Sequence, residues 1–157
     1  MLSAVDDTGR RILAIASGGG HWVQLRRLKP AFAGLNVAFA SVYQTYAAEV
    51  APNRYYSIPD VSRFSPHKLP LLLLRLYLLL WKERPDVVIT TGSFPGLVTI
   101  VLAKRLFGAK TIWIDSIANS ERLSTSGAWA KSFADIYLTQ WKHLEAPTGP
   151  FYWGAVL

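Results

Sequence analysis

Short apolar runs alternate with stretches of helical spacing along the whole chain of 157 residues. The runs are rich in Ile, Val, Thr and Tyr, which is typical of strands, and they fall at residues 10–17, 36–42, 54–58, 86–92, 110–115 and 136–140. Apolar positions repeat with a helical period between them, at residues 22–33, 68–84, 95–107 and 125–134. Several strands are apolar almost throughout, which favours parallel strands covered on both faces. The pattern therefore predicts an α/β fold, a doubly wound, Rossmann-like parallel sheet of about six strands in a single domain over residues 1–157.

A glycine-rich turn, Ser17-Gly18-Gly19-Gly20-His21, joins the first predicted strand to the first helix. Bare backbone at such a turn lets N–H groups approach an anion at the positive end of the helix, where a side chain would obstruct it. The turn lacks both the G-x-G-x-x-G fingerprint of dinucleotide sites and the Walker pattern, so a nicotinamide cofactor and a nucleoside triphosphatase are disfavoured. We expect no bound cofactor. The simpler alternative is that the glycines only make a tight strand-to-helix turn.

A second loop of the same kind, Thr90–Gly96, follows the fourth predicted strand. Ser93 is placed to cap the next helix, and Pro95 is placed to open it. Ligands of open α/β sheets bind beyond the carboxyl ends of the strands, where the strand order reverses, here between the first and fourth strands. Both loops are therefore expected to face one crevice, although ordinary capping explains Ser93 and Pro95 about as well.

The segment from Pro66 to Arg84 is the most unusual part of the chain, because eleven of the thirteen residues from Leu69 to Trp81 are Leu, Tyr or Trp. It is shorter than the roughly 20 apolar residues that a spanning helix needs. Its cations lie seven residues apart, so they fall on almost one line of a helix whose other faces carry leucine. Such a helix suits a membrane interface, with a buried core helix as the alternative. The residues expected at the membrane are Lys68, Leu72, Arg75, Leu79, Trp81 and Lys82.

The net charge of +7 and a pI near 9.9 suit anionic partners such as nucleic acid, anionic lipid or a phosphorylated substrate. Nucleic acid is disfavoured, because the chain has no helix-turn-helix or RNP-like motif. The chain has no cysteine, and His21, His67 and His143 lack metal-ligand spacing, so no metal is expected. Residues 1–11 show no apolar segment ahead of their charges, which predicts no secretory signal and a cytoplasmic location.

Four motifs follow one another along the chain. They are SGGGH at 17–21, VVITTGSFPGL at 87–97, IWIDSIANSERLSTSG at 112–127, and ADIYLTQWKHLE at 134–145 with YWGAVL at 152–157. In that order they resemble the amino-terminal half of lipid-linked glycosyltransferases of the GT-B fold, which has two Rossmann-like domains. The family is that of the membrane-bound subunit of the two-part UDP-N-acetylglucosamine transferase of dolichol-linked oligosaccharide synthesis, with its bacterial exopolysaccharide relatives. The peptidoglycan enzyme that glycosylates lipid I is a more distant likeness.

The resemblance implies a membrane-associated subunit on the cytoplasmic face of the membrane, peripheral or monotopic, that binds a polyprenyl-diphosphate-linked acceptor. A separate donor-binding subunit would bind the nucleotide sugar, so this chain alone is expected to be an inactive half of a hexosyltransferase-type enzyme. The transfer would belong to polysaccharide or oligosaccharide biosynthesis. The alternative is a non-catalytic membrane scaffold that recruits and orients a catalytic glycosyltransferase subunit.

Inverting sugar transfer needs a base that takes the proton of the acceptor hydroxyl. The candidates are His21, because histidine titrates near physiological pH, and Asp115, at the end of the fifth predicted strand. Alternatively, His21 caps the first helix or binds phosphate, and Asp115 orders the loop after it. The chain departs from the family pattern in two ways: Trp22 and Val23 follow the histidine, and Asp115 stands where relatives often have Glu. Contacts to the acceptor diphosphate or the subunit interface are expected from Ser17, Gly18, Gly19, Gly20, Thr91, Gly92, Ser93, Asn119 and Glu121.

Overall fold

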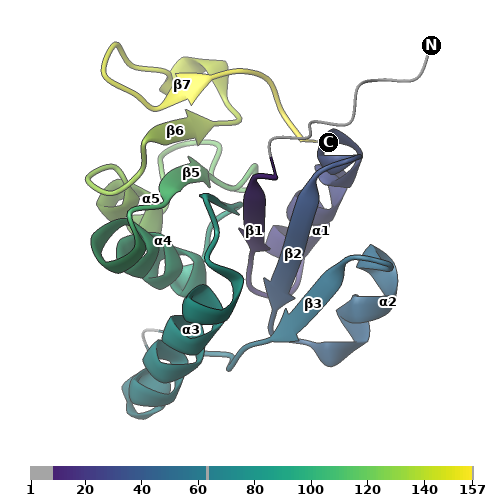
Figure 1. Ribbon diagram of the computed structural model, residues 1–157. Coiled ribbons are helices and arrows are strands. Elements are labelled where there is room, and N and C mark those ends of the chain that lie inside the picture. The colour runs from purple at the N-terminus through teal and green to yellow at the C-terminus, as the bar shows by residue number, and fades with distance from the viewer. Residues whose placement is uncertain (1–8, 63, 157) are drawn as a thin grey trace, which may run out of the picture.

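A single parallel sheet runs through the molecule in the computed structural model, which describes residues 9–62 and 64–156 (Figure 1). Its strands are β1 Arg11–Ile15, β2 Asn36–Ser41, β3 Arg54–Ser57, β4 Val87–Thr90, β5 Lys110–Ile114, β6 Ile136–Thr139 and β7 Phe151–Tyr152. The order across the sheet is β3-β2-β1-β4-β5-β6-β7, and every neighbouring pair is parallel. The order reverses between β1 and β4, where the sequence predicts the crevice.

Five α-helices and several short 3₁₀ turns connect the strands of the described residues. The helices are α1 Gly20–Arg27, α2 Ala47–Val50, α3 Leu69–Glu83, α4 Phe94–Phe107 and α5 Thr125–Ala130. The helix predicted at 22–33 ends early, because Pro30 lacks an N–H donor and the chain continues as a 3₁₀ turn over Lys29–Phe32. The helix predicted at 125–134 is also shorter and ends at Ala130.

Helices cover both faces of the sheet. Leu13 and Ile15 of β1 point into a core shared with α3, α4 and α5, whereas Ala14 and Ala16 point into the opposite core, shared with α1 and α2. Neighbouring residues of a strand face opposite sides of a sheet, so a strand buried on both sides must be apolar throughout. The prediction of a doubly wound, Rossmann-like sheet is therefore confirmed.

Two elements, α2 and β7, are missed by the sequence pattern. Both are very short, with four and two residues, so neither shows a hydrophobic period. Pairing of Leu138 with Phe151 and of Thr139 with Tyr152 defines β7, and this pairing joins parts of the chain that lie far apart in sequence. The expectation that there is no secretory signal concerns residues 1–11, of which 1–8 lie outside the described residues.

Candidate functional site

A cleft of about 560 Å³ opens beyond the carboxyl ends of β1, β4 and β5, at the switch point of the sheet. Its volume is typical of a small-molecule site. Polar groups that line it are Ser17, His21, Asp60, Ser62, Ser93, Ser116, Asn119, Ser124, Thr125 and Ser126. Apolar groups that line it are Val61, Phe64, Phe94, Pro95, Leu97, Ala118 and Trp129. The cleft thus offers hydroxyl groups and an apolar surface together, a combination that suits an amphiphilic ligand.

His21, in the first turn of α1, lines this cleft and is held in place by Thr91. The imidazole Nδ1 lies 2.9 Å from the carbonyl oxygen of Thr91, and because a carbonyl only accepts, Nδ1 carries the proton. In the neutral ring Nε2 is therefore the nitrogen that can accept a proton. The hydroxyl of Thr91 donates to the carbonyl oxygen of His21 at 2.7 Å. The bond at Nδ1 sets the tautomer and orients the ring, and the bond from the Thr91 hydroxyl holds the backbone of His21.

The loop after β4 supports this arrangement through Gly92 and Ser93. A Cβ on Gly92 would lie 3.0 Å from Cε1 and Nδ1 of His21, and the φ of Gly92 is +111°, so a side chain here would strain the backbone and crowd the His21 ring. The hydroxyl of Ser93 accepts hydrogen bonds from the backbone N–H of Gly96, at 3.4 Å, and of Ser17, at 3.3 Å. Ser93 therefore caps α4, as predicted, and also joins the two glycine-rich loops.

The glycines ahead of His21 serve packing and backbone geometry. A Cβ on Gly18 would lie 2.5 Å from Cε2 of Tyr43, so the bare backbone makes room for this ring. Gly19 has a φ of +66° and donates its N–H to the hydroxyl of Tyr46 at 3.3 Å. A Cβ on Gly20 would meet nothing within 4 Å. None of the three lines the cleft, so the tight-turn alternative accounts for Gly18 and Gly19, and phosphate binding by the three stays a prediction.

Asp115 is buried, with 1% of its surface exposed, and it does not line the cleft. Its Oδ1 accepts from Nε1 of Trp113 at 3.1 Å and from the hydroxyl of Ser124 at 2.6 Å. Its Oδ2 accepts from the N–H of Ser124 at 2.9 Å and from Nδ2 of Asn119 at 3.3 Å. These four hydrogen bonds favour the alternative, that Asp115 orders the loop after β5. A role of Asp115 as the base stays a prediction.

The other predicted site residues divide between the cleft and its surroundings. Asn119 lines the cleft, Glu121 is exposed outside its lining, and Thr91 and Gly92 are buried. Trp22, which departs from the family pattern, is buried in the core, where its ring stacks on Tyr46 with the centroids 4.6 Å apart.

Sequence reasoning misses one wall of the cleft, formed by Asp60 and the residues after it. Position is the signal that could have found it, because Asp60 follows the end of β3 at the same edge of the sheet. The hydroxyl groups at the start of α5 are also missed. There Ser124 accepts from the N–H of Gly127 at 2.8 Å, which is an ordinary N-cap readable from the sequence.

The leucine-rich helix α3 has one buried and one exposed face. Leu72 and Leu79 are 0% and 5% exposed and belong to the core cluster, so their prediction as membrane-facing residues is wrong. They lie seven residues apart on the same side of the helix, the side that packs on the sheet. Side chains between 38% and 56% exposed cover the outer face, and they are Leu71, Leu73, Leu74, Tyr77, Leu78 and Trp81.

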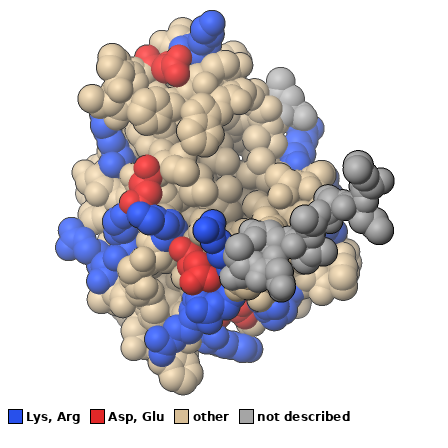
Figure 2. All heavy atoms as spheres, turned by 45° about the horizontal axis from the view of Figure 1, so that its top comes forward, with Lys and Arg blue, Asp and Glu red and all other residues tan. Residues whose placement is uncertain are grey.

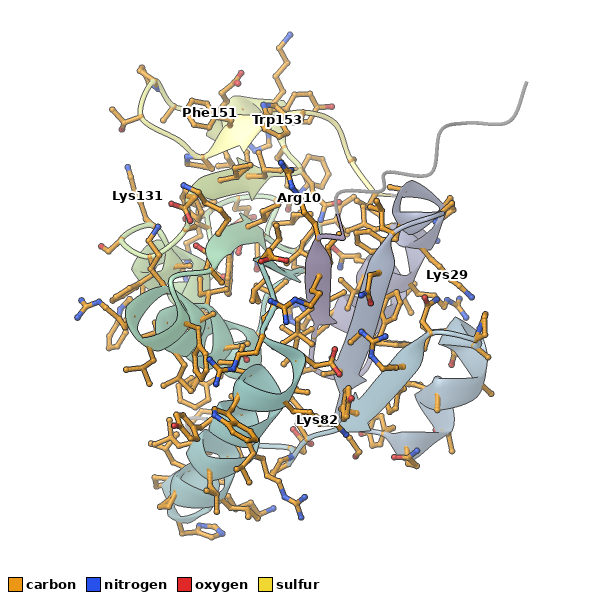
Figure 3. All side chains as sticks on the ribbon, viewed as in Figure 1. Arg10, Lys29, Lys82, Lys131, Phe151 and Trp153 are labelled. Carbon is orange, nitrogen blue, oxygen red and sulfur yellow. The ribbon has the colours of Figure 1, made fainter. Side chains whose placement is uncertain are left out.

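Three exposed cations, Lys68, Arg75 and Lys82, follow one border of this outer face. At about 100° per residue, they lie between the buried face and the exposed leucines, as the seven-residue spacing predicts. Lys82 points toward the sheet, where its Nζ lies 5.0 Å from the centre of the Tyr56 ring (Figure 3). Contact of these cations with lipid stays a prediction.

Glu83 ties the last turn of α3 to β3. Its carboxylate accepts from Nη2 of Arg54 at 2.9 Å and from the hydroxyl of Tyr56 at 2.5 Å. Burial alone would raise the pKa of Glu83, but the hydrogen bonds from Arg54 and Tyr56 outweigh this effect and hold the pKa below its ordinary value. The carboxylate of Glu83 thus holds the last turn of α3 against the edge of the sheet.

On the face shown in Figure 2, basic side chains gather in several groups with acidic side chains among them. Elsewhere in the structure as well as on this face, opposite charges can pair: Nε of Arg11 lies 3.7 Å from Oδ2 of Asp86. Within residues 9–62 and 64–156, no helix is both long and apolar enough to cross a membrane.

The strand order, the two glycine-rich loops and the cleft at the carboxyl edge define a Rossmann-like domain that matches the amino-terminal half of GT-B glycosyltransferases. MurG of Acinetobacter baumannii superimposes with a TM-score of 0.77 at 12% identity, over 94% of this chain and 46% of that protein. The Streptomyces sp. SF2575 glycosyltransferase SsfS6 gives a TM-score of 0.55 at 21% identity, over 83% of this chain and 49% of that protein. The UDP-GlcNAc 2-epimerase of Methanocaldococcus jannaschii gives a TM-score of 0.60 at 14% identity, over 82% of this chain and 39% of that protein. The chain spans less than half the length of these structures.

The chain belongs to the family of oligosaccharide biosynthesis proteins like Alg14, whose family model matches residues 57–156. No protein of curated function matches it in sequence. Family and fold together support a glycosyltransferase-related role in oligosaccharide biosynthesis, and they confirm the resemblance drawn from the four motifs.

Proposed function

We propose that this chain is the acceptor-binding subunit of a split glycosyltransferase and acts with a separate donor-binding subunit. The observation that carries the proposal is the orientation of His21, whose Nδ1 is committed to Thr91 while the ring lines a cleft with hydroxyl and apolar walls. The cleft suits the diphosphate and the first sugar of a polyprenyl-diphosphate-linked acceptor. Membership of the family of oligosaccharide biosynthesis proteins like Alg14 supports a separate partner subunit.

In the proposed reaction, Nε2 of His21 takes the proton of the acceptor hydroxyl as its oxygen attacks the anomeric carbon of the donor sugar. The bond from that carbon to the nucleoside diphosphate breaks, and the leaving group carries away the electron pair. Groups that neutralise this leaving group belong to the donor-binding subunit. Residues of this chain hold the acceptor, and the hydrogen bond from Nδ1 to Thr91 stabilises the imidazolium that forms.

The exposed face of α3 brings the protein to its substrate. A polyprenyl diphosphate keeps its tail in the bilayer, so only an enzyme at the interface reaches its head group. Six half-exposed apolar side chains with cations along one border form the surface that an interfacial helix needs. We place the protein on the cytoplasmic face of the membrane as a peripheral or monotopic subunit.

The test is sugar transfer by the chain reconstituted with its partner, which is first isolated by pull-down from native membranes. The wild-type chain alone should transfer no sugar, and the pair should transfer sugar to a polyprenyl-diphosphate acceptor. In the pair, His21→Asn should lower kcat about 100-fold or more, because asparagine keeps a donor near Thr91 but has no basic nitrogen. Asp115→Asn should instead lower thermal stability, because an amide nitrogen would face hydrogen-bond donors.

Two outcomes contradict parts of the proposal. Full turnover with His21→Asn would assign the chain a scaffold role, in which the partner holds the whole catalytic apparatus. Robust transfer by the chain alone would refute the split enzyme.

A further inference from the structure

A row of two buried side-chain amides connects the segment after β7 to Ser116, which lines the cleft. Gln24 of α1 and Gln140, which follows β6, are 5% and 4% exposed. Nε2 of Gln140 donates to Oε1 of Gln24 at 2.6 Å and to the carbonyl oxygen of Asp115 at 2.9 Å. The segment after β7 runs back toward α1 (Figure 1), and there the N–H of Val156 donates to Oε1 of Gln140 at 2.8 Å.

Gln24 is hydrogen-bonded to the loops that carry the residues of the site. Nε2 of Gln24 donates to the carbonyl oxygen of Gly20 at 3.2 Å and to the hydroxyl of Ser116 at 3.1 Å. Its Oε1 also accepts from the N–H of Ile117 at 3.1 Å. Gly20 immediately precedes His21, and Ser116 lines the cleft, so one side chain holds both sides of the site.

The direction of the row is set by backbone groups at its ends. The N–H of Val156 only donates, so Gln140 must turn its oxygen toward it and its nitrogen toward Gln24. Gln24 must then present its oxygen to Gln140 and its nitrogen to the carbonyl of Gly20, which only accepts. Each amide donates and accepts in the same sense, so neighbouring bonds strengthen one another.

We infer that Gln24 and Gln140 are positioning residues for the proposed transfer. They fix the position of the His21 turn relative to the loop after β5. They also connect both to the backbone at Val156. The inference rests on the proposed function for its effect on turnover. Its structural part, a mechanical link from the segment after β7 to the cleft, does not depend on any substrate.

Hydrogen exchange on the isolated chain tests the link. Gln140→Met removes the amide at nearly constant volume, and Val156→Pro removes the N–H that donates to Gln140 while also fixing the backbone φ at residue 156. Both should speed exchange of the Ile117 amide about tenfold or more while the core strand amides, such as that of Ile89, stay protected. Val156→Ala and Gln44→Met, which changes an exposed glutamine, are the controls and should change nothing. Unchanged exchange at Ile117 in both test variants overturns the link.

Turnover of the reconstituted pair tests the positioning role. Gln24→Met and Gln140→Met should each lower kcat about 10- to 100-fold with little change in the KM for the donor, because His21 is displaced and the donor site is not. The double variant should lose no more than the worse single variant, since the two amides act as one unit. Wild-type kcat in both variants overturns the positioning role. A wild-type pair that transfers no sugar refutes the proposed function, and the exchange experiment still decides the link.

Discussion

Replacing exposed leucines of α3 should release the protein from membranes without unfolding it. Leu74 and Leu78 are 54% and 48% exposed, and they lie four residues apart near the middle of the outer face. Complete burial of a leucine side chain is worth about 1.5–3 kcal/mol, so the exposed half of each contributes about 1 kcal/mol on entering lipid. Removing both therefore costs about 2 kcal/mol, which weakens binding about 30-fold.

The assay is co-sedimentation of the protein with vesicles that contain anionic lipid, with circular dichroism and thermal unfolding to follow the fold. Leu74→Gln/Leu78→Gln should shift the binding curve about 30-fold and leave the unfolding temperature near that of the wild type. Val23→Gln is a matched control, because Val23 is 37% exposed on α1, which covers the opposite face of the sheet. Leu72→Ala should instead lower the free energy of unfolding by about 2–5 kcal/mol, since Leu72 is fully buried.

The cations at the border of this face should add a charge-dependent part to vesicle binding. Each cation contributes about 1 kcal/mol to the free energy of binding to an anionic surface, so Arg75→Glu should weaken vesicle binding further. High salt should reduce the difference between Arg75→Glu and the wild type, because it screens these charges. Vesicle binding of Leu74→Gln/Leu78→Gln at wild-type strength would refute the assignment of α3 as the membrane-binding surface. An unfolded variant would show that the outer leucines stabilise the core more than their exposure indicates.

Two further predictions concern the site and the anchoring of α3. Gly92→Ala should lower kcat of the reconstituted pair at least about tenfold and destabilise the chain by about 1–2 kcal/mol. The reason is that the new Cβ would lie 3.0 Å from the His21 ring and that the backbone φ at this position is +111°. Unchanged kinetics and thermal unfolding would contradict the packing described for this ring. Since the pKa of Glu83 is lowered by folding, its stabilising effect should be fully present above its unfolded pKa of about 4.5 and should be lost as the pH falls through the lower folded value. Glu83→Gln should therefore flatten the acid limb of the stability curve below about pH 4.5, as measured by urea unfolding, and an unaltered acid limb would rule out this role.

The layers of the fold and the location of the cleft follow from local sequence patterns. Apolar runs such as β1 predict strands buried on both faces, and Ser93 and Pro95 predict the start of α4. These features depend on residues close together in sequence, so periodicity and capping reveal them. Strand order then places the crevice at β1 and β4 by a general rule of α/β sheets.

Long-range packing decides what the sequence does not predict. Leu72 and Leu74 are the same residue type two positions apart, yet one is fully buried and the other half exposed, because only the packing of α3 on the sheet separates its faces. The buried state of Asp115 likewise depends on Trp113 and Ser124 folding around it. Gln24 and Gln140 lie 116 positions apart, and neither carries a local signal of the bond between them.

The cleft, α3 and the edge strand β3 are connected through one continuous part of the chain. β3 ends at Ser57, and the chain then forms the cleft wall from Asp60 and enters α3 at Leu69. The far end of α3 returns to the same strand through the bonds of Glu83 to Arg54 and Tyr56. The buried leucines of α3 also pack into the core of the sheet, so the helix is held along its length and cannot tilt freely. On the proposed function, α3 lying on the bilayer therefore holds the cleft at a fixed height above it, so a lipid-linked head group reaches His21 without a movement of the chain.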